Sequence, residues 1–166
     1  YALLYGKTAF SLSQDIGVTQ QAAQAFIDAY FAGFPAVRQF IDRTLDEGRE
    51  TGMVKTLAGR RRPVPELTSR NGQVRSATER VAVNMPIQGT AADIIKVAMI
   101  RVDAELRERE LRSRMILQVH DELIFECPAD EVDAIRELAT RIMPAGLEMN
   151  VPLKVDLKQG KNWGGM

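Results

Sequence analysis

The sequence predicts an α+β fold, because long segments with helical periodicity occur together with short runs typical of β-strands. Apolar residues recur at three- and four-residue spacing within residues 20–33, 35–52, 74–110 and 129–143. Apolar runs of strand length occupy residues 53–57, 114–127 and 151–157. Together these segments predict a small antiparallel sheet packed against several helices.

The first two helices are expected to pack as an antiparallel pair. Thr19 can cap the first helix, and Phe34-Pro35 separates it from the second, in which Pro35 suits the first turn. The expected apolar faces are Ala22, Phe26, Ala29, Tyr30 and Gly33 in the first helix, and Val37, Phe40, Ile41, Thr44 and Leu45 in the second. A strand over 53–57 and a loop over 63–73 follow.

The second half of the chain should contain a long helix, a hairpin, a short helix and a last strand. Pro86 is expected to kink or divide the long helix, because proline lacks the amide proton that the helix needs. The inward face of that helix is expected to be Val83, Ile87, Ala91, Ile94, Ala98, Val102 and Leu106. The helix over 129–143 begins with the acidic residues Asp130, Glu131 and Asp133, as its dipole favours. Its expected inward face is Val132, Ile135, Leu138, Ala139 and Ile142. Alternation over 151–157 predicts the strand.

Composition points to one compact core in a soluble, cytoplasmic protein. The 166 residues include 22 basic and 22 acidic side chains, so a nucleic-acid partner would have to be bound by a local patch. The single cysteine, Cys127, excludes an internal disulfide and is expected to be a core thiol. No apolar run is long enough for a membrane helix. The chain begins at Tyr1 in an apolar stretch, which suggests a fragment of a longer polypeptide.

Three polar residues, His120, Asp121 and Glu122, interrupt the apolar run of residues 114–127. A hairpin tip there would let the two carboxylates converge, and oxygen ligands favour Mg²⁺ or Mn²⁺ over zinc. The alternative is a solvated turn, in which these residue types are common. One carboxylate pair cannot by itself hold two metal ions.

The residues Arg80, Asn84 and Gln88 recur at four-residue spacing and should lie along one edge of the long helix. Arginine can bind phosphate, and the two amides can bind acceptor atoms in a minor groove without requiring a particular base sequence. This pattern predicts an edge that contacts duplex DNA. The alternative is the ordinary polar margin of an amphipathic helix.

Two further groups could bind nucleic acid. Arg60, Arg61 and Arg62 follow a predicted strand and could bind phosphate, although a solvated basic turn would have the same composition. Tyr1 and Tyr5 lie one helical turn apart and could offer stacking surface to a base or sugar. Core packing is the alternative for this tyrosine pair.

In five stretches the sequence resembles the bacterial family A DNA polymerases, the DNA polymerase I family. These stretches are residues 1–6, 56–62, 79–93, 118–122 and 160–163, in the order and at the spacing of the family. The resemblance implies the end of the fingers helix and following helices over 1–52. It implies part of the polymerase palm over 53–166, with the catalytic hairpin at 114–127.

The activity that this resemblance implies is template-directed transfer of a dNTP to the 3′ end of a primer, with two Mg²⁺ ions. Asp121 would ligate the catalytic metal, Glu122 would be its acidic neighbour, and His120 would lie near the primer terminus. Tyr1 would lie beside the incoming sugar, and Tyr5 near the templating position.

The same resemblance assigns the remaining candidates to primer–template DNA. Arg80, Asn84 and Gln88 match the segment that contacts the minor groove, and the three arginines at 60–62 match a segment close to the template backbone. The implied protein is a monomeric, cytoplasmic, nucleoid-associated bacterial enzyme of DNA replication and repair.

The sequence also departs from the family pattern. The family's other metal-binding aspartate has no counterpart, and the Arg and Lys that hold the triphosphate upstream of Tyr1 are absent. We therefore expect the isolated chain not to polymerise. Two alternatives stay open: a non-catalytic nucleic-acid-binding module on the same scaffold, and another metal-dependent phosphoryl-transfer enzyme, which would need a further carboxylate cluster.

Overall fold

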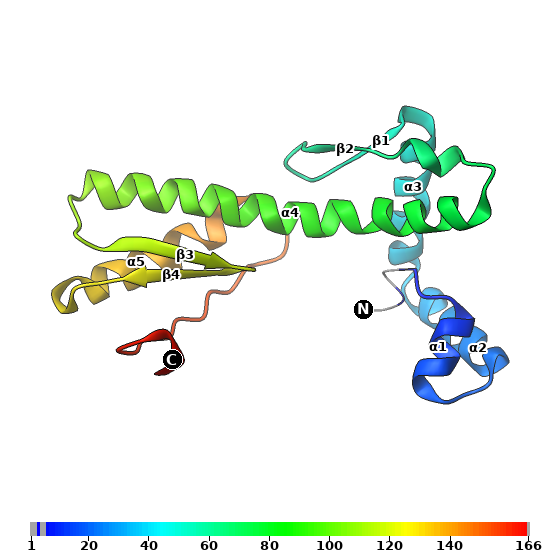
Figure 1. The fold of residues 1–166 in the computed structure, drawn as a ribbon, viewed down its shortest axis with the longest axis horizontal. Helices are drawn as coiled ribbons and strands as arrows, with labels where there is room; N and C mark the ends of the chain where they lie inside the picture. Colours follow the sequence, from blue (N-terminus) through cyan, green and yellow to red (C-terminus); the bar gives the residue numbers. More distant parts are fainter. Residues whose placement is uncertain (1–2, 4–5, 166) are drawn as a thin grey trace. The chain divides into compact units, whose positions relative to one another are not determined.

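The computed structural model describes residue 3 and residues 6–165 of the chain. Within that range the helices accompany two separate two-stranded antiparallel sheets, so the predicted α+β class is confirmed (Figure 1). The chain divides into two compact units, residues 1–90 and 91–166. The predicted division at residues 52 and 53 stays a prediction. Tyr1 and Tyr5 lie outside the described residues.

The first unit begins with a pair of helices, α1 (Ala9–Ile16) and α2 (Gln20–Gly33). The hydroxyl of Thr19 accepts the amide proton of Ala22 at 3.2 Å, which confirms Thr19 as the cap of α2. Ala23 of α2 packs on Leu12 of α1, so α2 pairs with α1 and the predicted pairing with the next helix is wrong.

The apolar face predicted for α2 is also wrong, because most of it is exposed; Phe26 is 57% exposed. The helix α3 (Pro35–Thr51) agrees better with its prediction. Thr44 is buried, and the rest of the predicted stripe is half-buried. The error on α2 follows from α1, which the sequence did not predict and which covers the opposite side of α2.

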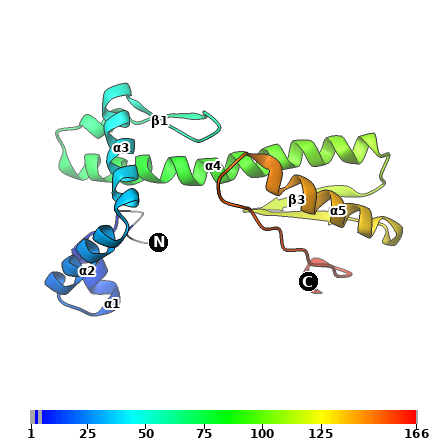
Figure 2. The same cartoon turned by 180° about the vertical axis from the view of Figure 1, so that it is seen from behind.

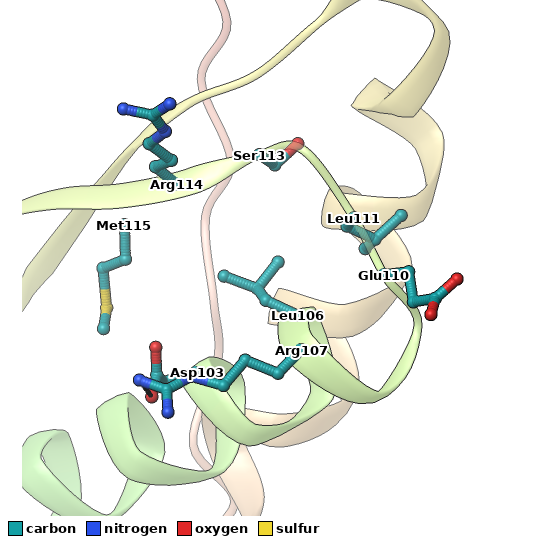
Figure 3. A pocket seen from close by; sticks show the side chains of 8 residues that line it. All are labelled: Asp103, Leu106, Arg107, Glu110, Leu111, Ser113, Arg114 and Met115. Carbon is teal, nitrogen blue, oxygen red and sulfur yellow. Dashed lines mark ion pairs between the residues drawn. The ribbon is translucent and has the colours of Figure 1, made fainter.

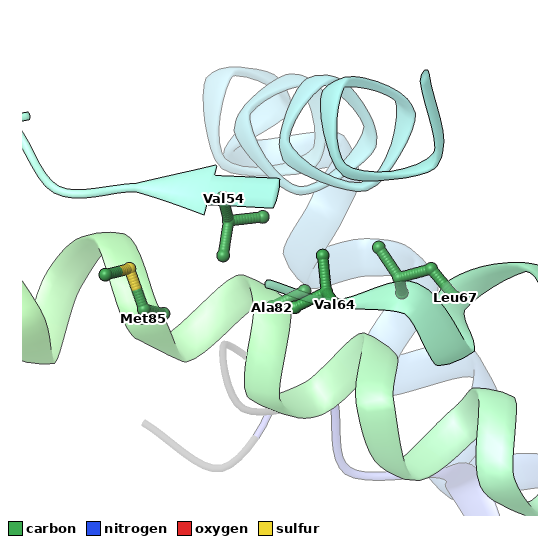
Figure 4. Close-up of a cluster of buried hydrophobic side chains, with 5 residues drawn as sticks. All are labelled: Val54, Val64, Leu67, Ala82 and Met85. Atoms are coloured by element: carbon green, nitrogen blue, oxygen red, sulfur yellow. The ribbon is translucent and has the colours of Figure 1, made fainter. Parts of the chain in front are cut away.

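The strands β1 (Met53–Lys55) and β2 (Arg61–Pro63) form a hairpin that packs on α3 and on α4 (Gly72–Glu108). Its core combines this hairpin, the short 3₁₀ helix at Pro65–Thr68 and the first half of α4 (Figure 4). The side chains of this cluster are Val54, Val64, Leu67, Ala82 and Met85, with Leu45 packed against them. The observed strand β1 is therefore shorter than the strand predicted over 53–57. The loop predicted over 63–73 begins with the last residue of β2 and the 3₁₀ helix.

The longest element is α4, which continues through Pro86, so of the two predicted alternatives, a kink or a division at this proline, the division is wrong. The side-chain oxygen of Asn71 accepts the amide protons of Gln73 and Val74 at 3.0 and 3.3 Å and so caps its first turn. Burial of residues on both sides of the proline, such as Ala82 and Thr90, offsets the lost hydrogen bond.

The second unit contains residues 91–108 of α4, the strands β3 (Arg114–Val119) and β4 (Glu122–Glu126), and α5 (Val132–Ile142). Both views show the β3–β4 hairpin running beside α5 (Figures 1 and 2). The core of this unit is formed by Val102, Leu106, Ile135, Leu138 and Ile142, with Leu111, Phe125 and Cys127 packed against it. The predicted inward face of α5 and the core position of the thiol are confirmed.

The strand predicted over residues 151–157 is wrong. Leu153 and Val155 are half-buried and Lys154 between them is exposed, whereas Val151 and Leu157 at the ends of the expected apolar face are exposed. No neighbouring strand pairs with it in the described part of the chain, and an extended segment without a hydrogen-bonded partner is not a strand. Within that same part, no helix is both long and apolar enough to cross a membrane.

Gly48 is expected to be essential for the packing of α3. A Cβ atom at this position would lie 2.6 Å from Cδ1 of Leu67 and 3.3 Å from Cγ1 of Val54. Gly48→Ala should therefore lower the free energy of unfolding by about 1–3 kcal/mol, as overpacking of a filled core does. Urea unfolding followed by circular dichroism measures the change.

The matched control is Gly33→Ala at the end of α2, where a Cβ atom would have nothing within 4 Å. Alanine there should leave stability unchanged or raise it by up to about 1 kcal/mol, because it reduces the entropy of the unfolded chain. Equal effects of the two substitutions would contradict the packing argument.

Candidate active site

The tip of the β3–β4 hairpin is a two-residue turn formed by His120 and Asp121, because Val119 pairs directly with Glu122. His120 adopts a left-handed conformation with φ of 53°, and its carbonyl oxygen accepts a hydrogen bond from Nε2 of Gln118 at 2.6 Å. Histidine is one of the few non-glycine residues enriched in this conformation. The hairpin and its tip were predicted from the sequence and are confirmed.

His120, Asp121 and Glu122 are all exposed. Neither carboxylate takes part in an ion pair or hydrogen bond with another residue among those described. Two adjacent carboxylates in water suit a hard cation, since Mg²⁺ binds few protein oxygens and keeps several waters. No group of three or more His, Cys, Asp or Glu residues in the described ranges is arranged to hold a metal ion. The tip by itself therefore offers at most two carboxylates to a cation.

The base of this hairpin is fixed by Glu131, a buried carboxylate at the start of α5. It accepts hydrogen bonds from the hydroxyl of Ser113 at 2.6 Å, from the amide of Ser113 at 2.8 Å, and from the amide and Nε of Arg112 at 3.0 Å each. These donors, the Ser113 hydroxyl first, lower the pKa of Glu131 from about 4.5 to about 2. From the sequence, Glu131 is expected only to interact favourably with the helix dipole.

A closed ring of ion pairs joins α4 to α5 in the same unit. Arg109 and Arg141 each contact both Glu105 and Glu137, with distances between 2.8 and 3.0 Å. Hydrogen bonds from Arg141 are the main cause of the lowered pKa of both carboxyl groups. The ring and Glu131 together attach α5 to the segments that precede and begin the hairpin.

In the first unit, Arg80, Asn84 and Gln88 lie along one edge of α4, as their spacing predicted. Arg80 and Gln88 are exposed, and Asn84 is half-buried. The Oδ1 atom of Asn84 is buried and accepts no hydrogen bond from the described residues. Buried amide oxygens normally have a hydrogen-bond donor, so this atom is an exception among the described residues.

The three predicted arginines lie on the β1–β2 hairpin, with Arg60 in its turn and Arg61 and Arg62 on β2, and all are exposed. The turn is attached to α4 by a hydrogen bond from the amide of Leu57 to the hydroxyl of Thr90, at 3.0 Å. Thr90 could not be identified from the sequence, because nothing in a linear pattern signals a contact between distant residues.

A cavity of about 350 Å³ opens where α4 ends and β3 begins (Figure 3). Its lining includes Asp103 and Arg107, which form an ion pair at 2.8 Å, together with Arg114 and Met115. None of the residues predicted for the site lines this cavity. Within each unit the described residues predicted for the site are exposed, except for the half-buried Asn84.

These features place the chain in a class of α+β proteins that have a carboxylate-bearing hairpin and a polar helix edge. Comparison with known proteins identifies the family within this class. The family profile described as DNA polymerase family A matches residues 1–165. The chain belongs to this family.

Particular relatives make the similarity more specific. The chain is 47% identical to DNA polymerase I of Bacillus subtilis and 47% identical to the thermostable DNA polymerase I of Thermus aquaticus, each over 98% of its length. It spans 18% and 19% of these two relatives, respectively.

A solved structure is similar as well. The polymerase domain of Pol1 from M. smegmatis, in complex with DNA primer-template and dNTP, matches with a TM-score of 0.89 and 45% identity. The match covers 93% of this chain and 27% of that one. At this identity the two chains share their fold in detail over the matched residues.

The low pKa of Glu131 predicts how acid affects stability. Because folding stabilises the ionised form, its contribution is fully present above about pH 4.5 and is lost as the pH falls toward 2. Glu131→Gln should therefore lower the free energy of unfolding most at neutral pH, and its difference from the wild type should shrink between pH 4.5 and 2. Urea unfolding across this range measures that difference.

Glu148→Gln is the control, because Glu148 is exposed. It should follow the wild type at every pH. A difference between wild type and Glu131→Gln that stays constant from neutral pH to pH 2 would contradict the role of the buried carboxylate.

Proposed function

We propose that this chain forms part of the active site of a DNA polymerase that adds dNTPs to the 3′ end of a primer on a template strand. The observation that carries the proposal is the match to a polymerase domain in complex with primer-template and dNTP, over 93% of the chain. The full-length gene product would supply the residues that complete the site, since the chain spans less than a fifth of its curated relatives.

At the hairpin tip, Asp121 and Glu122 would hold Mg²⁺, and His120 would lie beside the primer terminus. Two bound Mg²⁺ ions would acidify the primer hydroxyl and neutralise charge on the leaving pyrophosphate. The tip would contribute two exposed carboxylates, Asp121 in the two-residue turn and Glu122 at the start of β4. No protein nucleophile is needed for this chemistry.

The helix edge and the arginines would hold the DNA. The exposed Gln88 and the half-buried Asn84 would offer amide groups to acceptor and donor atoms in the minor groove. Arg80 and the arginines at 60–62 would bind phosphates. Tyr1 and Tyr5 would contact the incoming nucleotide and the templating base.

The further properties proposed from the family are those of a monomeric, cytoplasmic, nucleoid-associated enzyme of replication and repair. The 166 residues alone are expected not to extend primers, because one carboxylate hairpin cannot bind two metal ions. A binding module without catalysis is the competing function, and the next experiment separates the two.

Asp121→Asn in the full-length gene product should reduce magnesium-dependent primer extension by roughly a hundredfold or more, the scale of losing one electrostatic contact to the transition state. Binding of primer–template should stay within a factor of about two, because Asp121 is assigned to the metal and an exposed change costs little stability. Gel-based primer extension and fluorescence anisotropy measure the two quantities.

Glu126→Gln is the matched control, since Glu126 is exposed at the other end of β4. It should extend primers as the wild type does. Near-normal extension by Asp121→Asn would contradict the metal-ligand role, and binding without extension in the wild type would favour the non-catalytic module.

Gln88→Ala should have a milder effect than Asp121→Asn. It removes hydrogen bonds worth about 0.5–1.5 kcal/mol each and leaves the metal ligands unchanged. We expect kcat/KM for primer extension to fall by roughly two- to tenfold, the factor that this energy range gives. Gln73→Ala, an exposed position near the start of α4, should have no effect. Equal activities of the two variants would remove Gln88 from the DNA-binding edge.

A further inference from the structure

The β1–β2 hairpin carries three arginines, yet its tip buries little apolar surface. Leu57, in the turn, is 72% exposed, and Arg60, Arg61 and Arg62 are exposed as well. Val54 anchors the other end of the hairpin in the core. The orientation of the arginine-bearing end must therefore depend on polar contacts.

The turn is rigid within itself. The amide of Thr56 donates to the carbonyl oxygen of Arg60 at 2.9 Å, and the amide of Gly59 donates to the carbonyl oxygen of Thr56 at 3.0 Å. The hydroxyl of Thr56 accepts the amide proton of Arg60 at 3.1 Å. Thr56 is buried, with 3% of its surface exposed, so the turn moves as one piece with this residue.

Thr90 attaches this rigid turn to the helix. Its hydroxyl donates to the carbonyl oxygen of Pro86 and accepts the amide proton of Leu57, so it bridges α4 and the turn. Only 6% of the Thr90 surface is exposed, and water therefore offers little competition for either bond.

Gly89 sets how closely the two segments approach. A Cβ atom on Gly89 would lie 2.6 Å from the methyl carbon of Thr56. Any larger residue would therefore push the turn away from α4. Gly89 and Thr90 directly follow Gln88, so the attachment point adjoins the polar edge of the helix.

We propose that Thr90 is a positioning residue that holds Arg61 and Arg62 at a fixed distance and orientation from the Gln88 edge of α4. The two groups then form one surface, in which the arginines bind the phosphate backbone of the same DNA molecule that the helix edge contacts. This inference rests on the proposed function, because the surface is useful only if the protein binds duplex DNA.

If Thr90 has this role, the effects on DNA binding of removing its hydroxyl and of removing the arginines should be coupled. Arg61→Gln/Arg62→Gln should weaken primer–template binding and reduce the slope of log K against log salt by up to about 2, roughly one for each lost phosphate contact. Thr90→Val keeps the shape of the side chain and removes both hydrogen bonds. It should weaken binding by roughly threefold to tenfold, the factor expected for one lost hydrogen bond with its unpaired partner.

The decisive measurement is the double-mutant cycle. In the Thr90→Val background, the two arginine substitutions should cause less than half of their effect on log Kd in the wild type, because the arginines are no longer held against the DNA. Thr90→Ser keeps a hydroxyl and should restore both the affinity and the salt slope. A merely structural role for Thr90 would lower Tm without changing the salt slope or the coupling.

The experiment uses the full-length gene product, a fluorescein-labelled primer–template and anisotropy at several salt concentrations. Thr78→Val is the matched control, because the hydroxyl of this half-buried residue donates to the carbonyl oxygen of Val74 on the same helix at 3.0 Å and makes no bond to the described residues of the hairpin. It should leave Kd and the salt slope unchanged. Thermal unfolding of every variant reports whether it is folded.

If Thr90→Val does not fold, Gly89→Ala tests the same contact through the clash with Thr56 and should show the same loss of coupling. Additive effects of Thr90 and the arginines in folded variants would overturn the positioning role and leave the proposed function intact. An unchanged affinity in Arg61→Gln/Arg62→Gln would also overturn it. Failure of the wild type to bind primer–template would contradict the proposed function and the inference with it.

Discussion

The continuity of α4 is the constraint on which the rest of the structure depends. One helix from Gly72 to Glu108 supplies buried residues to both compact units, Ala82 and Met85 to the first and Val102 and Leu106 to the second. The helix keeps its hydrogen-bond ladder on both sides of a proline because tertiary packing outweighs a local defect of about 3 kcal/mol. Each β-hairpin then needs only one face to be apolar, which leaves the other free for polar groups.

Local features could be read from the sequence, whereas contacts between distant segments could not. The cap at Thr19, the inward face of α5 and the hairpin tip at His120 and Asp121 depend on neighbouring residues, and all three were predicted correctly. The buried face of α2 was predicted wrongly because packing against α1 determines it. The helix α1 is too short for its apolar periodicity to be recognised in the sequence. The segment 151–157 alternates as a strand does, but pairing requires a partner that periodicity cannot supply.

The same distinction between local features and contacts between distant segments applies to the candidate site. The helix edge of Arg80, Asn84 and Gln88 follows from four-residue spacing alone. The groups that hold such elements in place, Glu131 and Thr90, are ordinary polar residues in the sequence, and only the fold shows that they are buried and bonded to partners far along the chain. Apart from the half-buried Asn84, the described candidate ligand-binding residues are exposed, whereas Glu131 and Thr90 are buried and have hydrogen-bond partners that offset the cost of desolvation.

The two-residue turn at His120 and Asp121 also limits how this region can change through insertions and deletions. Successive side chains of a strand alternate between faces, so one added or removed residue would shift the pairing of β3 with β4 and reverse the face on which Glu122 lies. Loop tips elsewhere on a protein surface are the usual places where chain length varies between relatives. At this tip, insertions and deletions are as constrained as they are within a buried strand, although the tip is exposed to water.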